Sequence, residues 1–395
     1  MHSPDSGEPR KPYAVLLLTC CAVGFACFFS SFLRIPIVPL YAESLGASTA
    51  QVGAINAAFM LMAGLLAIPA GLLSDRFGRR RVILGGLLVI AASSLLLYLT
   101  KTPQQMTATY LLFGIGLAAY SPSMMSYVAD LAPRTHLGRA YGWYTVAANV
   151  AMMLGPATGG LLGRSLGLRA VFLVSGGLTL LMFFVAMASL PPLGAPQGAR
   201  RAVRPALGTL LRHRRYRACL LITLGGCFGF GLFMTFLPLH ASGLGLDAGH
   251  VGLIFAVQAL ANALSRIPFG RLSDRVADRS HLVVAGIVGL GASLALIGVS
   301  GSLAPLFAGA ALLGISMGVG FTALAALVAD VVPVELRGLA RGGYNSCIYL
   351  GMTASAASMG AFIARAGFAV SFAAGGAATL AAALLFRSLC RREAP

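Results

Sequence analysis

Residues 71–81 read Gly-Leu-Leu-Ser-Asp-Arg-Phe-Gly-Arg-Arg-Arg, and residues 270–280 repeat the pattern as Gly-Arg-Leu-Ser-Asp-Arg-Val-Ala-Asp-Arg-Ser. The copy starts 199 positions later, and the match extends upstream without a gap, so that 14 of the 30 residues in 52–81 are identical to their counterparts. A duplication of this period in an apolar chain is typical of membrane proteins built from two homologous halves related by an axis along the membrane normal. Such halves enclose a path at their interface, which favours a transporter.

The composition predicts that nearly the whole chain lies in a membrane. Of 395 residues, 58% are hydrophobic and only 10% are charged, against about 25% charged residues in soluble domains. Apolar runs of about 20 residues recur along the chain, and only helices satisfy their own backbone in hydrocarbon. We predict an all-α membrane protein with twelve transmembrane helices, at residues 13–41, 50–74, 80–100, 104–130, 138–163, 168–190, 217–241, 249–273, 280–300, 303–330, 337–364 and 367–387.

These spans form two pseudo-symmetric six-helix bundles, with predicted domains at residues 1–190 and 217–395. The segment 191–216, rich in Pro, Gly and Arg, breaks the apolar pattern and is the predicted cytoplasmic linker. The first apolar stretch is too long for the core of a signal peptide and has no convincing cleavage site, so we expect it to be retained as the first helix.

The net charge of +18 is distributed by topology and does not indicate nucleic-acid binding. Of the 29 Lys and Arg residues, 23 fall on one side of the predicted topology, four fall on the other, and two lie within spans. This positive-inside pattern places both termini in the cytoplasm and the chain in the cytoplasmic (inner) membrane. We expect the basic clusters to contact the anionic headgroups of membrane lipids.

The sequence offers no chemistry typical of an enzyme. It contains no nucleophile–base pair, no metal-ligand cluster and no phosphate-binding loop, so we expect no catalytic residue, no cofactor and no metal. Most of the seven cysteines lie inside apolar spans, where a thiol behaves as a small hydrophobic group, and we expect no disulfide.

The repeated segment resembles the loop between the second and third helices of the major facilitator superfamily, whose signature is Gly-x-x-x-Asp-Arg-x-Gly-Arg-Arg. The first copy matches at Gly71, Asp75, Arg76, Gly78, Arg79 and Arg80; the second keeps Gly270, Asp274, Arg275 and Arg279 but has Ala277 in place of the later glycine. Asp130 and Asp330, each followed by Pro three residues later, resemble the family's loop between helices four and five. The resemblance covers nearly the whole chain and implies alternating access about a central cavity. We expect these aspartates and arginines to form a conformational switch of ion pairs that break and re-form as the halves rock.

A second motif resembles the fifth helix of the superfamily's exporters. The spacing Gly-x8-Gly-x3-Gly-Pro-x2-Gly-Gly is matched, with Ala151 in place of one glycine, by Gly142, Gly155, Pro156, Gly159 and Gly160. Small residues allow close helix contact, and the Gly-Pro pair is expected to kink the helix. The second half lacks the motif, which favours a specific role over general packing. The resemblance implies proton-coupled efflux, although generic small-residue packing would also explain these residues.

The charges within the spans favour an anionic solute. All eleven acidic residues fall in loops, tails or helix ends, whereas Arg34 lies in the first span and Arg266 in the eighth. Intramembrane charge is costly and usually functional, so both arginines are candidate substrate-binding residues. Arg266-Ile267-Pro268 also resembles the eighth-helix arginine of carboxylate carriers in this superfamily. The alternatives are that Arg266 reaches the cytoplasmic edge, and that Arg34 binds carbonyls freed by Pro36 and Pro39.

The remaining candidates are titratable groups for proton coupling and polar side chains for substrate contact. Tyr110 stands where many proton-driven exporters carry an arginine, so the titratable candidates for proton coupling are Glu43 and His240. Further candidate substrate contacts are polar or aromatic side chains that equally suit helix–helix hydrogen bonds: Asn56, Tyr120, Asn149, Gln258, Asn262, Tyr344, Asn345 and Tyr349.

Two functions satisfy these patterns. The first is a secondary-active exporter of an amphipathic or anionic metabolite or drug, with a proton as the candidate coupling ion. The second is an organic-anion (carboxylate) carrier that uses Arg34 and Arg266 in symport, exchange or uniport. A non-transporting membrane sensor is a third, remote reading. The expected partners are a small-molecule substrate and membrane lipid, and the resemblance implies a monomer.

Overall fold

The computed structural model describes residues 13–193, 208, 210–276, 278–333 and 336–391. Most of the predicted linker, residues 194–207 and 209, lies outside the described residues, as do Ala277, Asp5, Glu8, Glu335 and Glu393. The described chain is helical, with α1 (Tyr13–Leu33), α2 (Ile37–Ser44), α3 (Thr49–Phe77), α4 (Arg79–Leu99), α5 (Pro103–Leu131), a short 3-10 turn η1 (Arg134–His136), α6 (Leu137–Leu166), α7 (Leu168–Ser189), α9 (Arg214–Gly243), α10 (Ala248–Arg275), α11 (Ser280–Val299), α12 (Leu303–Asp330) and α13 (Arg337–Arg391).

Among the described residues, eleven helical segments are long and apolar enough to cross a membrane. One of them joins α1 and α2 across a turn at residues 34–36, where Pro36 precedes α2. The last, α13, is two helices joined at Gly367, whose φ of 75° interrupts the helical backbone and is a conformation that favours glycine. The predicted fold class, twelve transmembrane helices in two bundles, is therefore confirmed.

Helix starts repeat between the halves as the sequence does. Ser48 caps α3, where its side chain accepts a hydrogen bond from the Gln51 N–H and the Ser48 N–H donates one to Gln51 Oε1. Asp247, 199 residues later, caps α10 by accepting from the His250 N–H. Caps of this kind satisfy helix N–H groups that have no partner within the helix.

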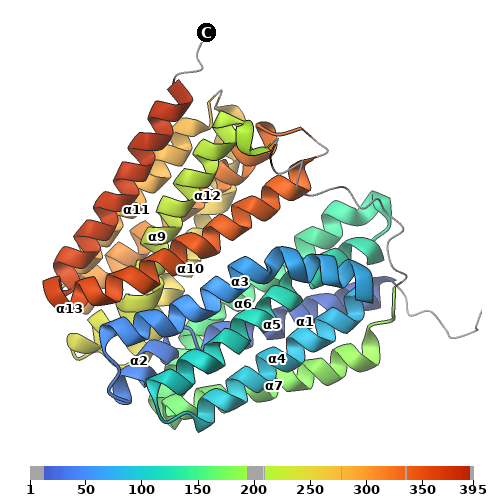
Figure 1. Cartoon of the computed structure of the whole chain (residues 1–395), viewed down its shortest axis with the longest axis horizontal. Helices are drawn as coiled ribbons and strands as arrows, with labels where there is room; N and C mark the ends of the chain where they lie inside the picture. The colour runs from blue at the N-terminus through green and yellow to red at the C-terminus, as the bar shows by residue number, and fades with distance from the viewer. Residues whose placement is uncertain (1–12, 194–207, 209, 277, 334–335, 392–395) are drawn as a thin grey trace, which may run out of the picture.

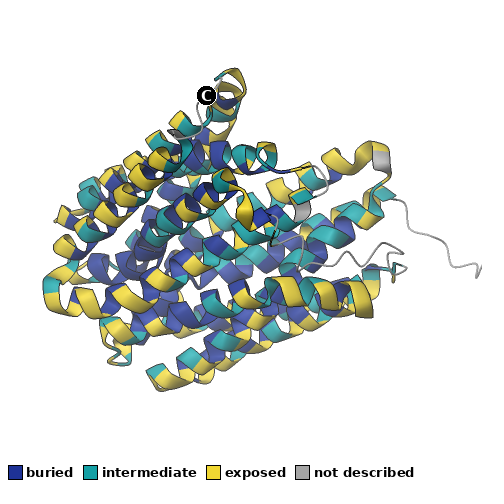
Figure 2. Cartoon of the chain, turned by 45° about the horizontal axis from the view of Figure 1, so that its top comes forward, coloured by how far each residue is buried: buried dark blue, intermediate teal, exposed yellow. Residues whose placement is uncertain are grey.

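The helices gather into an N-terminal half, α1–α7, and a C-terminal half, α9–α13 (Figure 1). Packing inside one half has its counterpart in the other: α3 packs on α5 as α10 packs on α12, and α4 packs on α5 as α11 packs on α12. Burial follows these contacts, with exposed positions on the outward faces of the bundles (Figure 2). Many exposed side chains are large and apolar, among them Trp143, Leu264 and Leu384, as expected for helices that face lipid.

The helices finish at two opposite ends of the molecule. At the closed end, α2, α6 and α9 finish and α3 and α10 begin. At the basic end, α3, α5, α10 and α12 finish. Figure 1 shows the two halves close together at the first of these ends and spread apart at the second, beside the C-terminus. The positive-inside pattern assigns the basic end to the cytoplasm.

Candidate functional site

The two halves meet first where α3 crosses α13. A Cβ built on Gly53 would overlap the Ala356 carbonyl oxygen, and one on Gly64 would lie 2.9 Å from the Cβ of Tyr349. The Thr49 hydroxyl donates a hydrogen bond of 2.7 Å to the Gly360 carbonyl oxygen across the same crossing. The contacts cover the part of α3 nearest the closed end.

The second crossing, between α6 and α10, uses the exporter-like motif. Gly160 lies against Ala248 and Gly252 of α10, where an added Cβ would overlap the Ala248 carbonyl oxygen. In return, a Cβ on Gly252 would lie 2.5 Å from the Pro156 carbonyl oxygen. Gly155 and Gly159 face α1 instead, against Phe32 and Leu33. The motif thus packs α6 closely against both α1 in its own half and α10 in the other.

The same helix faces that touch at the closed end are separated toward the basic end. Gly71 lies seven residues beyond Gly64, on the same face of α3, and Gly142 lies five turns from Gly160 on the same face of α6. A Cβ on Gly71, Gly142 or Gly342 of α13 would meet nothing within 4 Å. We call the region between these faces the interhalf space; it opens at the basic end.

Arg266 is the charged side chain best placed to face the interhalf space. It lies 14 residues from Gly252, about 21 Å further along α10 and about 40° from the face that touches α6. It is exposed, and its Nε donates a hydrogen bond of 2.8 Å to Asn262 Oδ1. The Tyr344 hydroxyl of α13 lies near the Arg266 guanidinium. Asn262 leaves most of the guanidinium available to a ligand.

Two other predicted residues lie close to the helix faces that touch across the halves, but nearer the basic end, where those faces border the interhalf space. Asn149 is half-buried and lies within about 20° of the Gly160 face of α6. Asn345 is exposed and lies about 40° from the Tyr349 direction on α13. Arg266, Asn149 and Asn345 therefore come from three different helices toward one space, whereas Tyr349 itself packs at the α3–α13 crossing.

Three predicted residues are buried within helix contacts. Gln258 donates from Nε2 to the Met317 sulfur of α12 at 3.5 Å, so it supports packing inside the C-terminal half. Tyr120 is fully buried with its ring 6.2 Å from that of Phe28, inside the N-terminal half. Asn56 is also buried, on α3. These three side chains are buried between helices, whereas Arg266 is exposed, so Arg266 is better placed to contact a solute in this conformation.

Arg34 lies inside the N-terminal half and does not face the interhalf space. Its side chain is fully buried, with Nη1 donating to the Ser94 hydroxyl at 2.7 Å and to the Ser93 hydroxyl at 3.3 Å. The guanidinium carbon lies 3.7 Å from the centre of the Phe113 ring. Because these partners surround the guanidinium within one bundle, Arg34 does not contact a solute in the interhalf space in this conformation.

Neither predicted coupling residue lies in the interhalf space. His240 is buried, with Nε2 3.1 Å from the Ile297 carbonyl oxygen and with its ring against those of Phe368 and Phe372. These partners all belong to the C-terminal half. Glu43 is exposed near the end of α2.

The two halves carry matching ion-pair clusters at the basic end. In the N-terminal half, Arg79 forms an ion pair through Nε with Asp130 and lies 3.7 Å from Asp75; the Asp130 contact is not aligned as a hydrogen bond. Gly78 provides the turn before α4 with a φ of 90°. Neighbouring Arg80 donates to the Met187 carbonyl oxygen of α7 at 2.6 Å, and the Arg76 guanidinium lies over the Phe77 ring.

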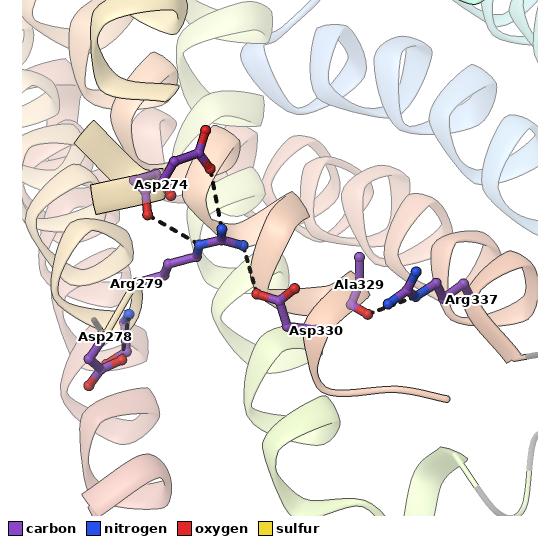
Figure 3. Close-up of polar contacts among 8 residues, drawn as sticks. Asp274, Asp278, Arg279, Ala329, Asp330 and Arg337 are labelled. Carbon is purple, nitrogen blue, oxygen red and sulfur yellow. Dashed lines mark hydrogen bonds and ion pairs between the residues drawn. The ribbon is translucent and has the colours of Figure 1, made fainter. Parts of the chain in front are cut away.

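Figure 3 shows the C-terminal cluster, in which Arg279 lies between two aspartates. Its Nη1 donates to Asp330 Oδ2 at 2.6 Å, its Nη2 to Asp274 Oδ1 at 3.3 Å, and its Nε to the Ser273 carbonyl oxygen at 3.2 Å. Beside it lies a basic pocket of about 570 Å³ lined by residues that include His213, Arg214, Arg279 and Asp330. Among the predicted switch residues, Arg275 and Gly270 lie outside these pairs, and a Cβ added at Gly270 would lie 3.9 Å from the Thr322 side chain. Each cluster joins residues of its own half, so the basic end is not held shut by them.

An ion pair that the sequence did not predict crosses the closed end. Arg164 of α6 lies 3.2 Å from Asp247, the cap of α10, and the same carboxylate accepts from His250 Nδ1 at 2.8 Å. The hydrogen bond from the His250 backbone N–H is the main cause that holds the pKa of Asp247 below its usual range. The capping pattern Asp247-x-x-His250 indicated the helix start, but nothing in the sequence indicated that Arg164 lies opposite.

These features define a class: an integral membrane transporter made of two repeated helical halves, joined at one end and open at the other. The chain belongs to the Major Facilitator Superfamily, whose family model matches residues 20–250 and 219–395. It is 25% identical over 330 residues to the uncharacterized MFS-type transporter MJ1560 of Methanocaldococcus jannaschii, covering 82% of this chain and 85% of that protein. It is 27% identical over 298 residues to the multidrug resistance protein MdtG of Escherichia coli, covering 72% of each.

Among solved structures, the nucleoside transporter NupG superposes with a TM-score of 0.83 at 13% identity, covering 95% of this chain and 99% of that one. At this identity the likeness shows the fold alone. The family match and the similarity to MFS transporters identify the chain as a secondary transporter.

Proposed function

We propose that this chain exports an amphipathic or anionic organic solute from the cytoplasm, and that Arg266 binds the anionic group of that solute in the interhalf space. The observation that carries the proposal is the position of Arg266, exposed on the continuation of the α6-contacting face of α10. A guanidinium pairs well with a carboxylate because its fork of N–H donors matches the two oxygens.

The surrounding charges favour an anion. In the described helices each acidic residue lies within the last turn of its helix, at Glu43, Asp75, Asp130, Asp274 and Asp330. No carboxylate of those helices therefore competes with a solute for Arg266 at mid-membrane depth. Asn149 and Asn345, from α6 and α13, add neutral hydrogen-bonding groups that could orient the solute.

The conformation supports cytoplasmic loading under the positive-inside assignment. The interhalf space opens at the basic end, and the two crossings close the other end. Release then needs the crossings and the Arg164–Asp247 pair to separate while the Arg79 and Arg279 clusters rearrange. In this proposal the chain acts as a monomer in the cytoplasmic membrane, with both termini in the cytoplasm and a proton as the exchanged ion.

The direction of transport is supported by the exporter-like motif at the α6–α10 crossing and by the similarity to a multidrug resistance protein. A second candidate function is an organic-anion carrier that works by symport, exchange or uniport. The lack of a mid-membrane carboxylate in the described helices favours it, because proton exchange has no obvious carrier there. Both functions use Arg266 to bind the anion, and they differ in the gradient that drives transport.

Transport into proteoliposomes with an imposed pH gradient tests both points. We expect organic anions to be transported in preference to matched cations. Uptake should be driven by an acidic lumen for the proton-exchanging exporter, by an acidic exterior for symport with protons, and only by a solute gradient for exchange or uniport. Arg266→Gln removes a charged hydrogen-bond donor worth about 1.5–3 kcal/mol, so the apparent affinity for the anion should fall about 10- to 150-fold.

Arg271→Gln is the matched control, because Arg271 is exposed on the same helix but points about 140° away from Arg266. It should leave the apparent affinity unchanged. Arg266→Lys should recover part of the lost affinity, since the charge is kept and the fork is not. Anion transport that is equal in the wild type and in Arg266→Gln, at equal protein level, excludes the proposed site.

A further inference from the structure

A buried cation inside the N-terminal half has no charged partner. The guanidinium of Arg34 is fully buried between α1, α4 and α5, and none of the ion pairs made by the described residues involves it. Its side chain donates hydrogen bonds to two hydroxyls, those of Ser93 and Ser94. Both hydroxyls donate in turn to the Ile90 carbonyl oxygen, so they act toward Arg34 as neutral acceptors. The positive charge is therefore solvated on one side but not neutralised.

The opposite edge of the same guanidinium has no hydrogen-bond partner. Both Nε and Nη2 of Arg34 are buried and unpaired among the described residues. These two nitrogens lie side by side, and together they present the pair of parallel N–H donors that binds an anion in bidentate fashion. Buried donors without partners are costly, and a buried charge without a counter-ion is more so.

The C-terminal half shows that the fold does not require a cation at this place. The 199-residue offset puts Phe233 where Arg34 stands, with Pro39-Leu40 matched by Pro238-Leu239. In the third and fourth helices of each half the offset is 200 residues, as the ends of α4 at Leu99 and α11 at Val299 show. Ser94 and Phe113 then correspond to Leu294 and Leu313.

Phe233, Leu294 and Leu313 are all fully buried, so the C-terminal half fills the places of Arg34, Ser94 and Phe113 with apolar side chains. Ser293, the counterpart of Ser93, donates its hydroxyl to the Leu290 carbonyl oxygen. One half of the molecule thus packs this position as ordinary core. The other half retains an unneutralised guanidinium with two adjacent free donors there, which packing alone does not explain.

We propose that the free edge of Arg34 binds a halide-sized monovalent anion, chloride under ordinary conditions, inside the N-terminal half. The anion would accept from Nε and Nη2 and neutralise the buried charge, while Phe113 covers one face of the guanidinium. Both nitrogens are buried inside one bundle, so a small monatomic anion suits the site better than a carboxylate-bearing solute does. The site is separate from the Arg266 site, and it does not depend on which solute is transported.

Bromide substitution tests the site directly. Crystals of the full chain grown in sodium bromide should give an anomalous peak within hydrogen-bonding distance of Nε and Nη2 of Arg34, and the peak should be absent in gluconate. Ordered water at both nitrogens without a bromide peak would overturn the proposal. This measurement uses the wild-type protein, so it does not depend on any variant folding.

A stability measurement provides the second test. Thermal unfolding of the purified full chain at constant ionic strength should show a saturable rise of a few degrees in Tm with chloride or bromide over gluconate. Arg34→Met, which imitates the apolar filling of the C-terminal half, should fold and lose this halide dependence. Arg169→Met is the control, because Arg169 bonds to the Tyr41 hydroxyl elsewhere in the same half, and it should keep the dependence. An equal halide effect in Arg34→Met and the wild type contradicts the proposal.

Discussion

Adding one methyl group at Gly160 should shift the protein away from the conformation described here. A Cβ at this position would overlap the Ala248 carbonyl oxygen and lie 2.9 Å from the Cα of Gly252, both in the other half. Neither is the flexible end of a side chain, so the two backbones must separate. Overpacking of this kind costs about 1–3 kcal/mol. This free-energy cost destabilises only the conformation in which the halves touch at the closed end. The equilibrium between that conformation and the one in which they separate there should therefore shift by about 5- to 150-fold.

Gly142→Ala is the matched control for Gly160→Ala. Gly142 lies five turns away on the same face of the same helix, and its Cβ would meet nothing within 4 Å. Both substitutions replace a helical glycine by alanine and gain about 1 kcal/mol of intrinsic helix propensity. The difference between the two variants therefore isolates the contact across the halves.

Spin labels at the exposed positions Ser165 of α6 and Leu253 of α10, in a cysteine-free background, report the separation at the closed end. Pulsed electron resonance should show a longer distance population for Gly160→Ala and a wild-type distribution for Gly142→Ala. Solute transport should fall in the first variant only. Identical distance distributions in the two variants would show that the α6–α10 crossing does not control closure.

Three further outcomes are expected. Gly367→Ala places a Cβ in a backbone with φ of 75° and should lower the stability of the full chain by about 1–2 kcal/mol in thermal unfolding, whereas Gly301→Ala, which meets open space at ordinary φ, should not. Arg279→Gln leaves Asp274 and Asp330 without their shared cation, so transport should fall while Arg337→Gln, which loses only a bond to the Ala329 carbonyl oxygen, should transport at near the wild-type rate. Asp247 has a pKa lowered chiefly by the His250 N–H, so its stabilising effect is present above about pH 4 and is lost as the pH falls through the lower folded-state pKa. Thermal unfolding between pH 6 and pH 3 should therefore show a smaller acid loss for Asp247→Asn than for the wild type, by less than about 1 kcal/mol because the carboxylate is partly exposed; an equal loss contradicts this reading.

The fold was predictable because the repeat indicates two homologous halves and the apolar runs indicate membrane-spanning helices. The duplicated Gly-x-Leu-Ser-Asp-Arg segments predicted two halves, and the structure gives equivalent helix pairs on both sides. Pro36 and Pro39 predicted a break in the first span; the break falls at residues 34–36, and Pro39 lies within α2. The residues at close helix–helix contacts were also predictable, because small residues recur at a helical spacing in α6: Gly155, Pro156, Gly159 and Gly160.

The direction in which each polar side chain points was not predictable. A soluble helix separates its buried face from its exposed face by polarity, but a membrane helix is apolar toward both lipid and protein. Arg34 and Arg266 therefore looked equivalent in sequence, although one lies inside a bundle and the other faces the interhalf space. Likewise the pairing of Arg164 with Asp247 joins residues far apart in the chain, which local patterns do not connect.

The joint between the halves is made largely from glycine and main-chain atoms, with few rotatable side chains. Parting it requires little rearrangement of rotamers, so the hinge motion can stay the same while the residues at the wide mouth change. In the proposed function, a substitution at Arg266 changes which solute is bound and leaves the contact between Gly160 and Gly252 intact. Selectivity and mechanics would then evolve on separate parts of one scaffold.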